Sequence, residues 1–239
     1  MREPVSYIPI LTTLVAVPFA VMVFARWRER RTGLHLLWWS AGILLYGVGT
    51  LTEAMTTLFG WHEAVFRGWY ISGALLGAAP LAQGTVYLLF DRRTANRMTA
   101  ALLPFILVAA TCVLLSPIDL ARVQPYHLTG RVLEWGWVRF FSPFLNTYSA
   151  IFLIGGAIVS AVKFSRDAST RHRAVGNVLI ATGAILPGIG GTATRMGHTE
   201  VLYVTELIGI LFILAGYRTV VGGPKPVLSS AAVSSAPSR

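Results

Sequence analysis

Two acidic residues lie inside apolar stretches of this sequence, where an ionised side chain is costly unless a polar partner meets it. Glu53 belongs to the stretch 34–58, and Glu206 belongs to the stretch 201–221. At helical spacing, the face of Glu53 carries small and polar residues, and the face of Glu206 carries two glycines. These residues are Tyr46, Gly49, Thr50 and Thr57 beside Glu53, and Gly209 and Gly216 beside Glu206. The pattern predicts that both carboxyl groups point into protein.

Other polar residues stand at the same level along the expected helices. Arg67 precedes the apolar stretch 68–90, and Arg195 follows the stretch 174–193. We therefore predict one polar cluster near one end of the protein, made of Glu53, Arg67, Tyr70, Asn146, Arg195, Tyr203 and Glu206. Three interpretations of this cluster remain open: ion pairs that fix helix packing, a binding site for a small ligand or lipid headgroup, or a catalytic centre.

The remaining chemistry-bearing residues favour a protein that is not an enzyme. The sequence contains no HExxH or Gly-x-Ser-x-Gly motif, and its five histidines are isolated. Its single cysteine, Cys112, excludes an internal disulfide and a cysteine-based metal cage. No lysine occurs in the stretch 201–221, which excludes a retinal Schiff base there. We expect no catalytic residue, no metal and no cofactor.

The elements that must position these residues are membrane-spanning helices. Hydrophobic residues make up 54% of the 239 residues and charged residues only 13%, which is too apolar for a soluble domain. Seven stretches have the length and apolarity to cross a bilayer: 5–25, 34–58, 68–90, 98–116, 144–162, 174–193 and 201–221. The sequence therefore predicts an all-α integral membrane bundle over residues 5–221. Residues 222–239, rich in Pro, Gly, Ser and Ala, are expected to form a disordered cytoplasmic tail.

The placement of basic residues predicts the orientation of this bundle. With the N-terminus outside, most of the basic residues fall in the cytoplasmic turns, beginning with the segment RWRERR at 26–31. This distribution follows the positive-inside bias of membrane proteins. It accounts for the net charge of +10 without nucleic acid as a partner. We expect a multi-pass protein of the plasma membrane, of bacterial type, whose C-terminus is cytoplasmic.

Two helices and one connection carry further signals. Gly73, Gly77 and Gly84 form a stripe on the helix 68–90, which predicts a central helix with neighbouring helices on that face. The run Pro187-Gly188-Ile189-Gly190-Gly191 predicts a kink or a partly unwound turn in the helix 174–193, where Gly188, Gly191 and Arg195 share one face. The aromatic connection 117–143 suits a segment in the membrane interface, or a lid over a pocket.

Several of these segments resemble the N-terminal seven-helix sensor region of bacterial and archaeal histidine kinases. The similar segments are the basic turn WRERR, the Trp-rich helix LLWWSAGILLYGVGTLTE, the start RGWY, and the turn and helix SRDASTRHRAVGNVLIATGAILPG. The resemblance covers residues 5–221 and implies a sensor whose ligand varies within the family. No kinase or cyclase sequence follows Gly222, so we expect a stand-alone version that acts through a partner protein.

The leading hypothesis is thus a receptor-like sensor or binding module for a small molecule or lipid. The lipid bilayer surrounds it, and a protein partner meets it in the membrane or at the cytoplasmic face. The alternative is a structural or accessory subunit of a larger membrane complex that binds no signal.

Overall fold

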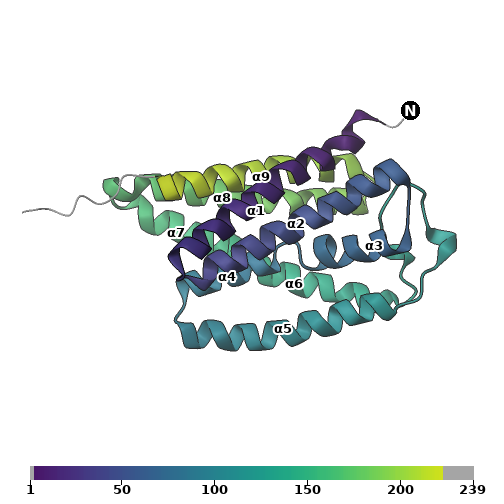
Figure 1. Ribbon diagram of the computed structural model, residues 1–239, viewed down its shortest axis with the longest axis horizontal. Coiled ribbons are helices and arrows are strands. Elements are labelled where there is room, and N and C mark those ends of the chain that lie inside the picture. The colour runs from purple at the N-terminus through teal and green to yellow at the C-terminus, as the bar shows by residue number, and fades with distance from the viewer. Residues whose placement is uncertain (1–2, 223–239) are drawn as a thin grey trace, which may run out of the picture.

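The computed structural model describes residues 3–222, which fold into an elongated bundle of antiparallel helices (Figure 1). Seven helical spans in this range are long and apolar enough to cross a membrane, which confirms the predicted all-α class and the seven stretches. The helices are α1 (Ile8–Arg30), α2 (Leu34–Phe59), α3 (Glu63–Trp69), α4 (Ala79–Leu89), α5 (Arg92–Leu115), α6 (Phe141–Ser149), α7 (Gly156–Ser165), α8 (Arg171–Arg195) and α9 (Thr199–Gly222). The tail predicted over residues 222–239 lies, apart from Gly222, outside the described residues.

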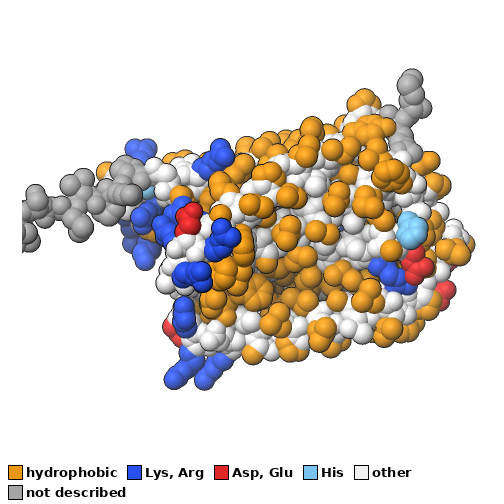
Figure 2. Space-filling view, in the orientation of Figure 1, with side chains coloured by type: hydrophobic (Ala, Val, Ile, Leu, Met, Phe, Trp, Pro, Cys, Tyr) orange, Lys and Arg blue, Asp and Glu red, His pale blue; other side chains and the backbone are white. Residues whose placement is uncertain are grey.

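Successive spans run in opposite directions, so the turns gather at two ends. One end, called here the basic end, contains the C-terminus of α1, the start of α5 and the turn between α7 and α8. Figure 2 shows Lys and Arg side chains crowded at this end and hydrophobic side chains over the long sides. The other end, called the acidic end, contains the start of α9 and the loop before α6. Asp91 begins α5 at the basic end, where the Thr94 backbone N–H donates to its carboxylate at 3.0 Å and lowers its pKa.

The third span is not one regular helix. A π-helical segment, η2 (Tyr70–Leu75), follows α3, and the chain turns before α4 begins beside Pro80. Leu75, Ala82 and Val86, across the helix from the glycine stripe, are buried, whereas Leu88 and Leu89 near its end are exposed. Neighbouring helices therefore pack on both faces over most of the span. The predicted close approach on the glycine face is confirmed: a Cβ on Gly49 would lie 3.1 Å from the Gly73 Cα.

The helices α8 and α9 form the closest pair of the bundle. Three glycines on α8, seven residues apart, face the backbone of α9: Gly176, Gly183 and Gly190. Two glycines on α9, also seven residues apart, face α8: Gly209 and Gly216. A Cβ on Gly183 would lie 2.6 Å from the Gly209 carbonyl oxygen, and one on Gly216 would lie 2.5 Å from the Gly176 oxygen. Gly188 and Gly191, which share a face with Arg195, meet nothing within 4 Å. The unwound turn predicted at Pro187 was not found, because α8 continues through this residue.

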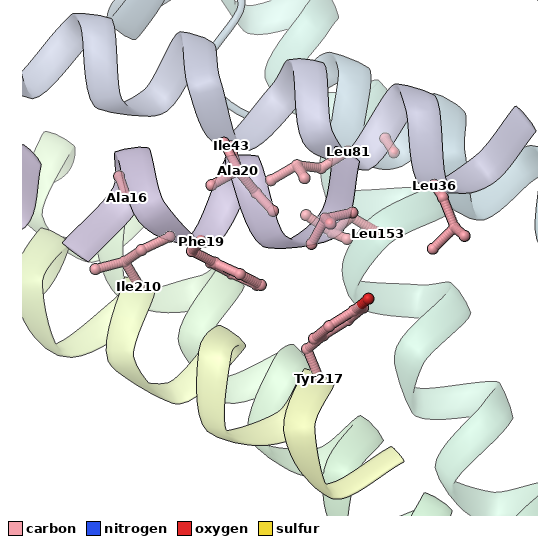
Figure 3. Packing of buried hydrophobic residues seen from close by; sticks show 11 residues of the cluster. Ala16, Phe19, Ala20, Leu36, Ile43, Leu81, Leu153, Ile210 and Tyr217 are labelled. Carbon is pink, nitrogen blue, oxygen red and sulfur yellow. The ribbon is translucent and has the colours of Figure 1, made fainter. Parts of the chain in front are cut away.

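The core joins α9 to the first half of the chain. Figure 3 shows Phe19 of α1 against Tyr217 of α9, with ring centroids 5.6 Å apart, and Ile43 and Leu81 on the other side of α1. The π-helical η6 (Ala150–Gly155), between α6 and α7, contributes Leu153 to the same cluster. Burial of these side chains packs α1 against both α2 and α9, and it brings side chains of α2 within reach of α9, as in the contact of Tyr46 with the Glu206 backbone. These two helices carry the two acidic residues singled out above.

The loop before α6 covers the acidic end. It contains three short 3-10 turns, η3 (Leu120–Arg122), η4 (Gly130–Val132) and η5 (Gly136–Phe140), and two isolated β-bridges. Leu128, Val132 and Leu133 pack on Phe66 and Tyr70, so this loop is part of the core rather than a detached segment. Its aromatic face remains outside: Trp135 and Trp137 are exposed and stack at 5.9 Å. That face is consistent with the predicted place in the membrane interface.

Candidate functional site

Glu53 and Glu206 lie against each other between α2 and α9. Each carboxyl group is about 10 Å from the acidic end of its helix, at 1.5 Å rise per residue. They are close enough to share a side-chain hydrogen bond. Glu53 is only 4% exposed, although it is acidic. The sequence-based prediction that both acids point into protein is the part of the cluster that the structure assembles.

Aromatic side chains surround this carboxyl pair. The Trp69 indole Nε1 donates to Glu53 Oε1 at 2.9 Å, and the Tyr46 hydroxyl donates to the Glu206 backbone oxygen at 2.9 Å. Both carboxyl groups also act electrostatically on the hydroxyl of Tyr203, which is buried one turn before Glu206 on α9. The site is therefore a small polar chamber with aromatic walls.

The carboxyl pair is short of donors. Each group keeps one buried oxygen, Oε2, that has no hydrogen-bond partner within residues 3–222. A carboxylate is an acceptor only, so two of them bond to each other only when one carries a proton. Two ionised groups in this position would repel each other in a medium of low dielectric constant. The pair must take up a proton or another positive group from outside the described chain.

A pocket opens at the acidic end about one helical turn beyond the carboxyl pair, and neither Glu53 nor Glu206 lines it. It has a volume of about 250 Å³ and is lined by Glu3, Val5, Ser6, Thr57, Tyr126, His127, Thr199, Glu200 and Tyr203. Thr57 stands one helical turn beyond Glu53, and Tyr203 one turn beyond Glu206, so the pocket continues the same faces of α2 and α9. Two acidic residues at its rim give it the same charge sign as the pair beneath. We call this pocket together with the pair the carboxyl site.

Arg67 does not join this site, contrary to the predicted cluster. Its guanidinium pairs with Glu63 at 2.7 Å, one turn earlier on α3, and donates to the backbone oxygens of Val113 and Ser116 at the end of α5. The nearness of Arg67 to Glu53 along the bundle axis had suggested an ion pair. Glu63 is the nearer acid, because residues four positions apart on one helix lie on the same face.

The other predicted residues lie in three different places. Tyr203 lies in the carboxyl site, as described. The Tyr70 ring packs against Gly130 of the covering loop, and Arg195 acts on Tyr70 electrostatically. Asn146 and Arg195 are exposed and make no side-chain hydrogen bond or ion pair with the described residues. The cluster of seven residues thus contracts to Glu53, Tyr203 and Glu206.

Several residues of the carboxyl site escaped the sequence-based prediction. Trp69 is next to the predicted Tyr70 in the sequence. Its place beside an acid could have been predicted, since a buried indole N–H needs an acceptor. Glu3, Tyr126, His127 and Glu200 come from the chain start, a loop and a helix end. No periodicity links such positions to α2 or α9.

Gln83 forms a second buried polar group, deeper in the bundle. Its Nε2 donates to Thr99 Oγ1 at 2.8 Å and to the Ala95 oxygen at 3.2 Å, and its Oε1 accepts from the Tyr148 hydroxyl. All of its neighbours are satisfied within the protein, so this network ties α4 to α5 and α6. It offers no free group to a ligand.

No three His, Cys, Asp or Glu side chains within residues 3–222 gather closely enough to hold a metal ion. Comparison of the chain with protein-family models, curated proteins and solved structures finds no match. The resemblance to the sensor region of histidine kinases therefore stays a prediction from the sequence.

Proposed function

We propose that this protein is a receptor-like sensor of the plasma membrane that binds a small ligand at the carboxyl site and acts through a protein partner. One observation carries the proposal: two buried carboxyl groups keep oxygens without donors beneath a pocket that opens at the acidic end. A group kept only for helix packing needs no opening above it. Unsatisfied buried acceptors are costly, and a ligand that donates to them recovers that cost.

The charge of the site favours a small organic cation, such as a protonated amine. Glu3 and Glu200 line the pocket, and Glu53 and Glu206 lie below them. An ammonium group has donors and a positive charge to offer both free oxygens, and the walls of Tyr126 and Tyr203 suit its apolar part. The pocket volume of about 250 Å³ limits the ligand to a small molecule.

Binding at this place would affect the packing of α2 against α9. The two carboxyl groups come from these two helices, so one cation held by both draws the helices together. Both helices reach the basic end, where a partner protein would detect the change. Such a sensor requires that the ligand bind one packing arrangement better than the other.

The test is a thermal-unfolding titration of the detergent-solubilised protein with choline, ethanolamine and putrescine. We expect at least one amine to stabilise the wild type, by about 2.7 kcal/mol at a hundredfold excess over its dissociation constant. The isosteric double variant Glu53→Gln, Glu206→Gln should lose this response, because neutral amides attract an ammonium group far less. Glu134→Gln, at an exposed acid of the covering loop, is the matched control and should respond like the wild type.

Two results would contradict the proposal. An unchanged amine response in the double glutamine variant would place binding elsewhere, and no response to any of the three amines would reject the ligand class. Stoichiometric co-purification with a membrane enzyme, together with no amine response, would favour the alternative of an accessory subunit.

The proposed orientation, with the acidic end outside, has its own test. In a Cys112→Ala background, Met196→Cys places a thiol at the acidic end, where Met196 is 76% exposed, and Ala168→Cys places one in an exposed turn at the basic end. A membrane-impermeant maleimide should label the first variant in intact cells. It should label the second only after permeabilisation, because the positive-inside bias places the basic turns in the cytoplasm. The reverse pattern would invert the orientation.

A further inference from the structure

The ribbons of α1 and α9 diverge toward the basic end (Figure 1), and residues of both helices line a cleft there. The cleft has a volume of about 540 Å³. Four residues of α1 and four of α9 line it: Met22, Ala25, Arg26, Glu29, Tyr217, Arg218, Val221 and Gly222. It lies at the far end of α9 from the carboxyl site, so the two sites are separate.

The cleft has an excess of unpaired positive charge. Arg26 and Arg218 line it, and Arg30 is near enough to act electrostatically on Tyr217 in its wall. None of these arginines forms an ion pair among the described residues. Glu29 is the single acid of the lining. Guanidinium groups brought together without acidic partners are suited to an oxyanion.

Tyr217 adds a buried donor to the same wall. Tyr217 is 7% exposed, and its hydroxyl lies close enough to Arg26 to interact with it, but the hydroxyl has no hydrogen-bond partner of good geometry within the described chain. Figure 3 shows the hydroxyl directed away from the α9 backbone, beyond the contact of the ring with Phe19. A buried hydroxyl is seldom left unsatisfied. An acceptor held by Arg26 would satisfy it.

We propose that this cleft binds the phosphate group of an anionic phospholipid. Arg26, Arg218 and the Tyr217 hydroxyl supply the donors for the phosphate oxygens. Met22, Ala25 and Val221 supply an apolar wall along which an acyl chain continues beside α1 and α9. The cleft stands where the apolar spans end, which is the level of headgroups in a bilayer. Free phosphate matches the arginines but makes no use of the apolar wall.

Such a lipid would bridge α1 and α9 across the cleft that both helices line. It would stabilise one spacing of the two helices. The basic end is also where a sensor of this shape would meet its partner, so the lipid composition of the inner leaflet would act on the same surface.

Native mass spectrometry and thermal unfolding in a neutral detergent test the proposal with the full chain. The probes are dioleoylphosphatidylglycerol, dioleoylphosphatidylcholine and inorganic phosphate. We expect dioleoylphosphatidylglycerol to remain bound and to raise the unfolding temperature more than dioleoylphosphatidylcholine or inorganic phosphate does. Arg26→Gln with Arg218→Gln should weaken this lipid roughly a hundredfold, at about tenfold for each lost charged hydrogen bond. Tyr217→Phe, which removes one hydroxyl and preserves the ring, should weaken it about tenfold.

The control removes the same charge elsewhere at the basic end. Arg92→Gln with Arg93→Gln alters two exposed arginines at the start of α5, outside the cleft, and should bind the lipid like the wild type. Equal losses in the two double variants would reduce the effect to general surface charge and overturn the proposal. The proposal would also be overturned if Tyr217→Phe bound phosphatidylglycerol with wild-type affinity and inorganic phosphate stabilised the protein as much as this lipid. Glu53→Gln with Glu206→Gln should leave the lipid response intact, so this proposal and the proposed function fail separately.

Discussion

Gly183→Leu is expected to destabilise the bundle by about 3 kcal/mol, the upper part of the range for overpacking a close contact. A Cβ at this position would lie 2.6 Å from the Gly209 carbonyl oxygen and 3.0 Å from the Ile213 backbone nitrogen. Backbone atoms do not rotate out of the way as a side chain does, so α9 itself must move. Because α9 carries Glu206 and Tyr203, the same variant should also weaken the amine response of the carboxyl site.

Gly188→Leu is the matched control for this prediction. It lies on the same helix five residues later, and a Cβ there meets nothing within 4 Å. Leucine is a better helix former than glycine, so this variant should be neutral or slightly stabilising. Unfolding temperatures measured in the same detergent compare the two. Equal temperatures for both variants would show that α8 and α9 do not pack through their backbones.

The glycine contacts also explain why α8 stays regular at Pro187. Proline has no N–H, so it cannot donate to the Gly183 carbonyl four residues earlier. That carbonyl faces α9 at Gly209, where a Cβ would lie only 2.8 Å from it. Glycine alone allows this approach, and Cα–H contacts to carbonyl oxygens recur at such interfaces. The sequence showed the proline, but the glycine of the neighbouring helix decided its effect.

Spans could be predicted from this sequence because bilayer thickness fixes their length. The inward direction of Glu53 and Glu206 also followed from the cost of a charge in an apolar span. Side-by-side placement of helices did not follow. The level of a residue along the bundle says nothing about which helix stands beside it, and Arg67 was therefore grouped with Glu53 and Glu206, although it pairs with Glu63.

Residues at loops and chain ends were beyond prediction for a different reason. Glu3, Tyr126 and Glu200 reach the pocket because the covering loop packs on Phe66 and because α1 and α9 begin side by side. These contacts are tertiary and leave no period in the sequence. The break in the third span, in contrast, had local signals in Gly77 and Pro80.

Arg67→Met is expected to destabilise the protein by about 3 kcal/mol, through the loss of two charged hydrogen bonds. The last carbonyl groups of a helix lack intrahelical donors. Val113 is a special case, since the residue four positions later is Pro117, which has no N–H. The Arg67 guanidinium donates to the Val113 oxygen and, at 3.0 Å, to the Ser116 oxygen, both at the end of α5. It holds α5 to α3 at the acidic end.

A structural role for Arg67 can be separated from a role in ligand binding. Glu63→Gln removes its ion pair, but Glu63 is 54% exposed, so that variant should cost only about 0.5 kcal/mol. Cys112 adjoins Val113 on α5 and is the single cysteine of the chain, so its rate of alkylation by N-ethylmaleimide reports whether α5 loosens. We expect faster alkylation in Arg67→Met and a wild-type rate in Glu63→Gln. An unchanged unfolding temperature and rate in Arg67→Met, combined with a lost amine response, would return Arg67 to the ligand site.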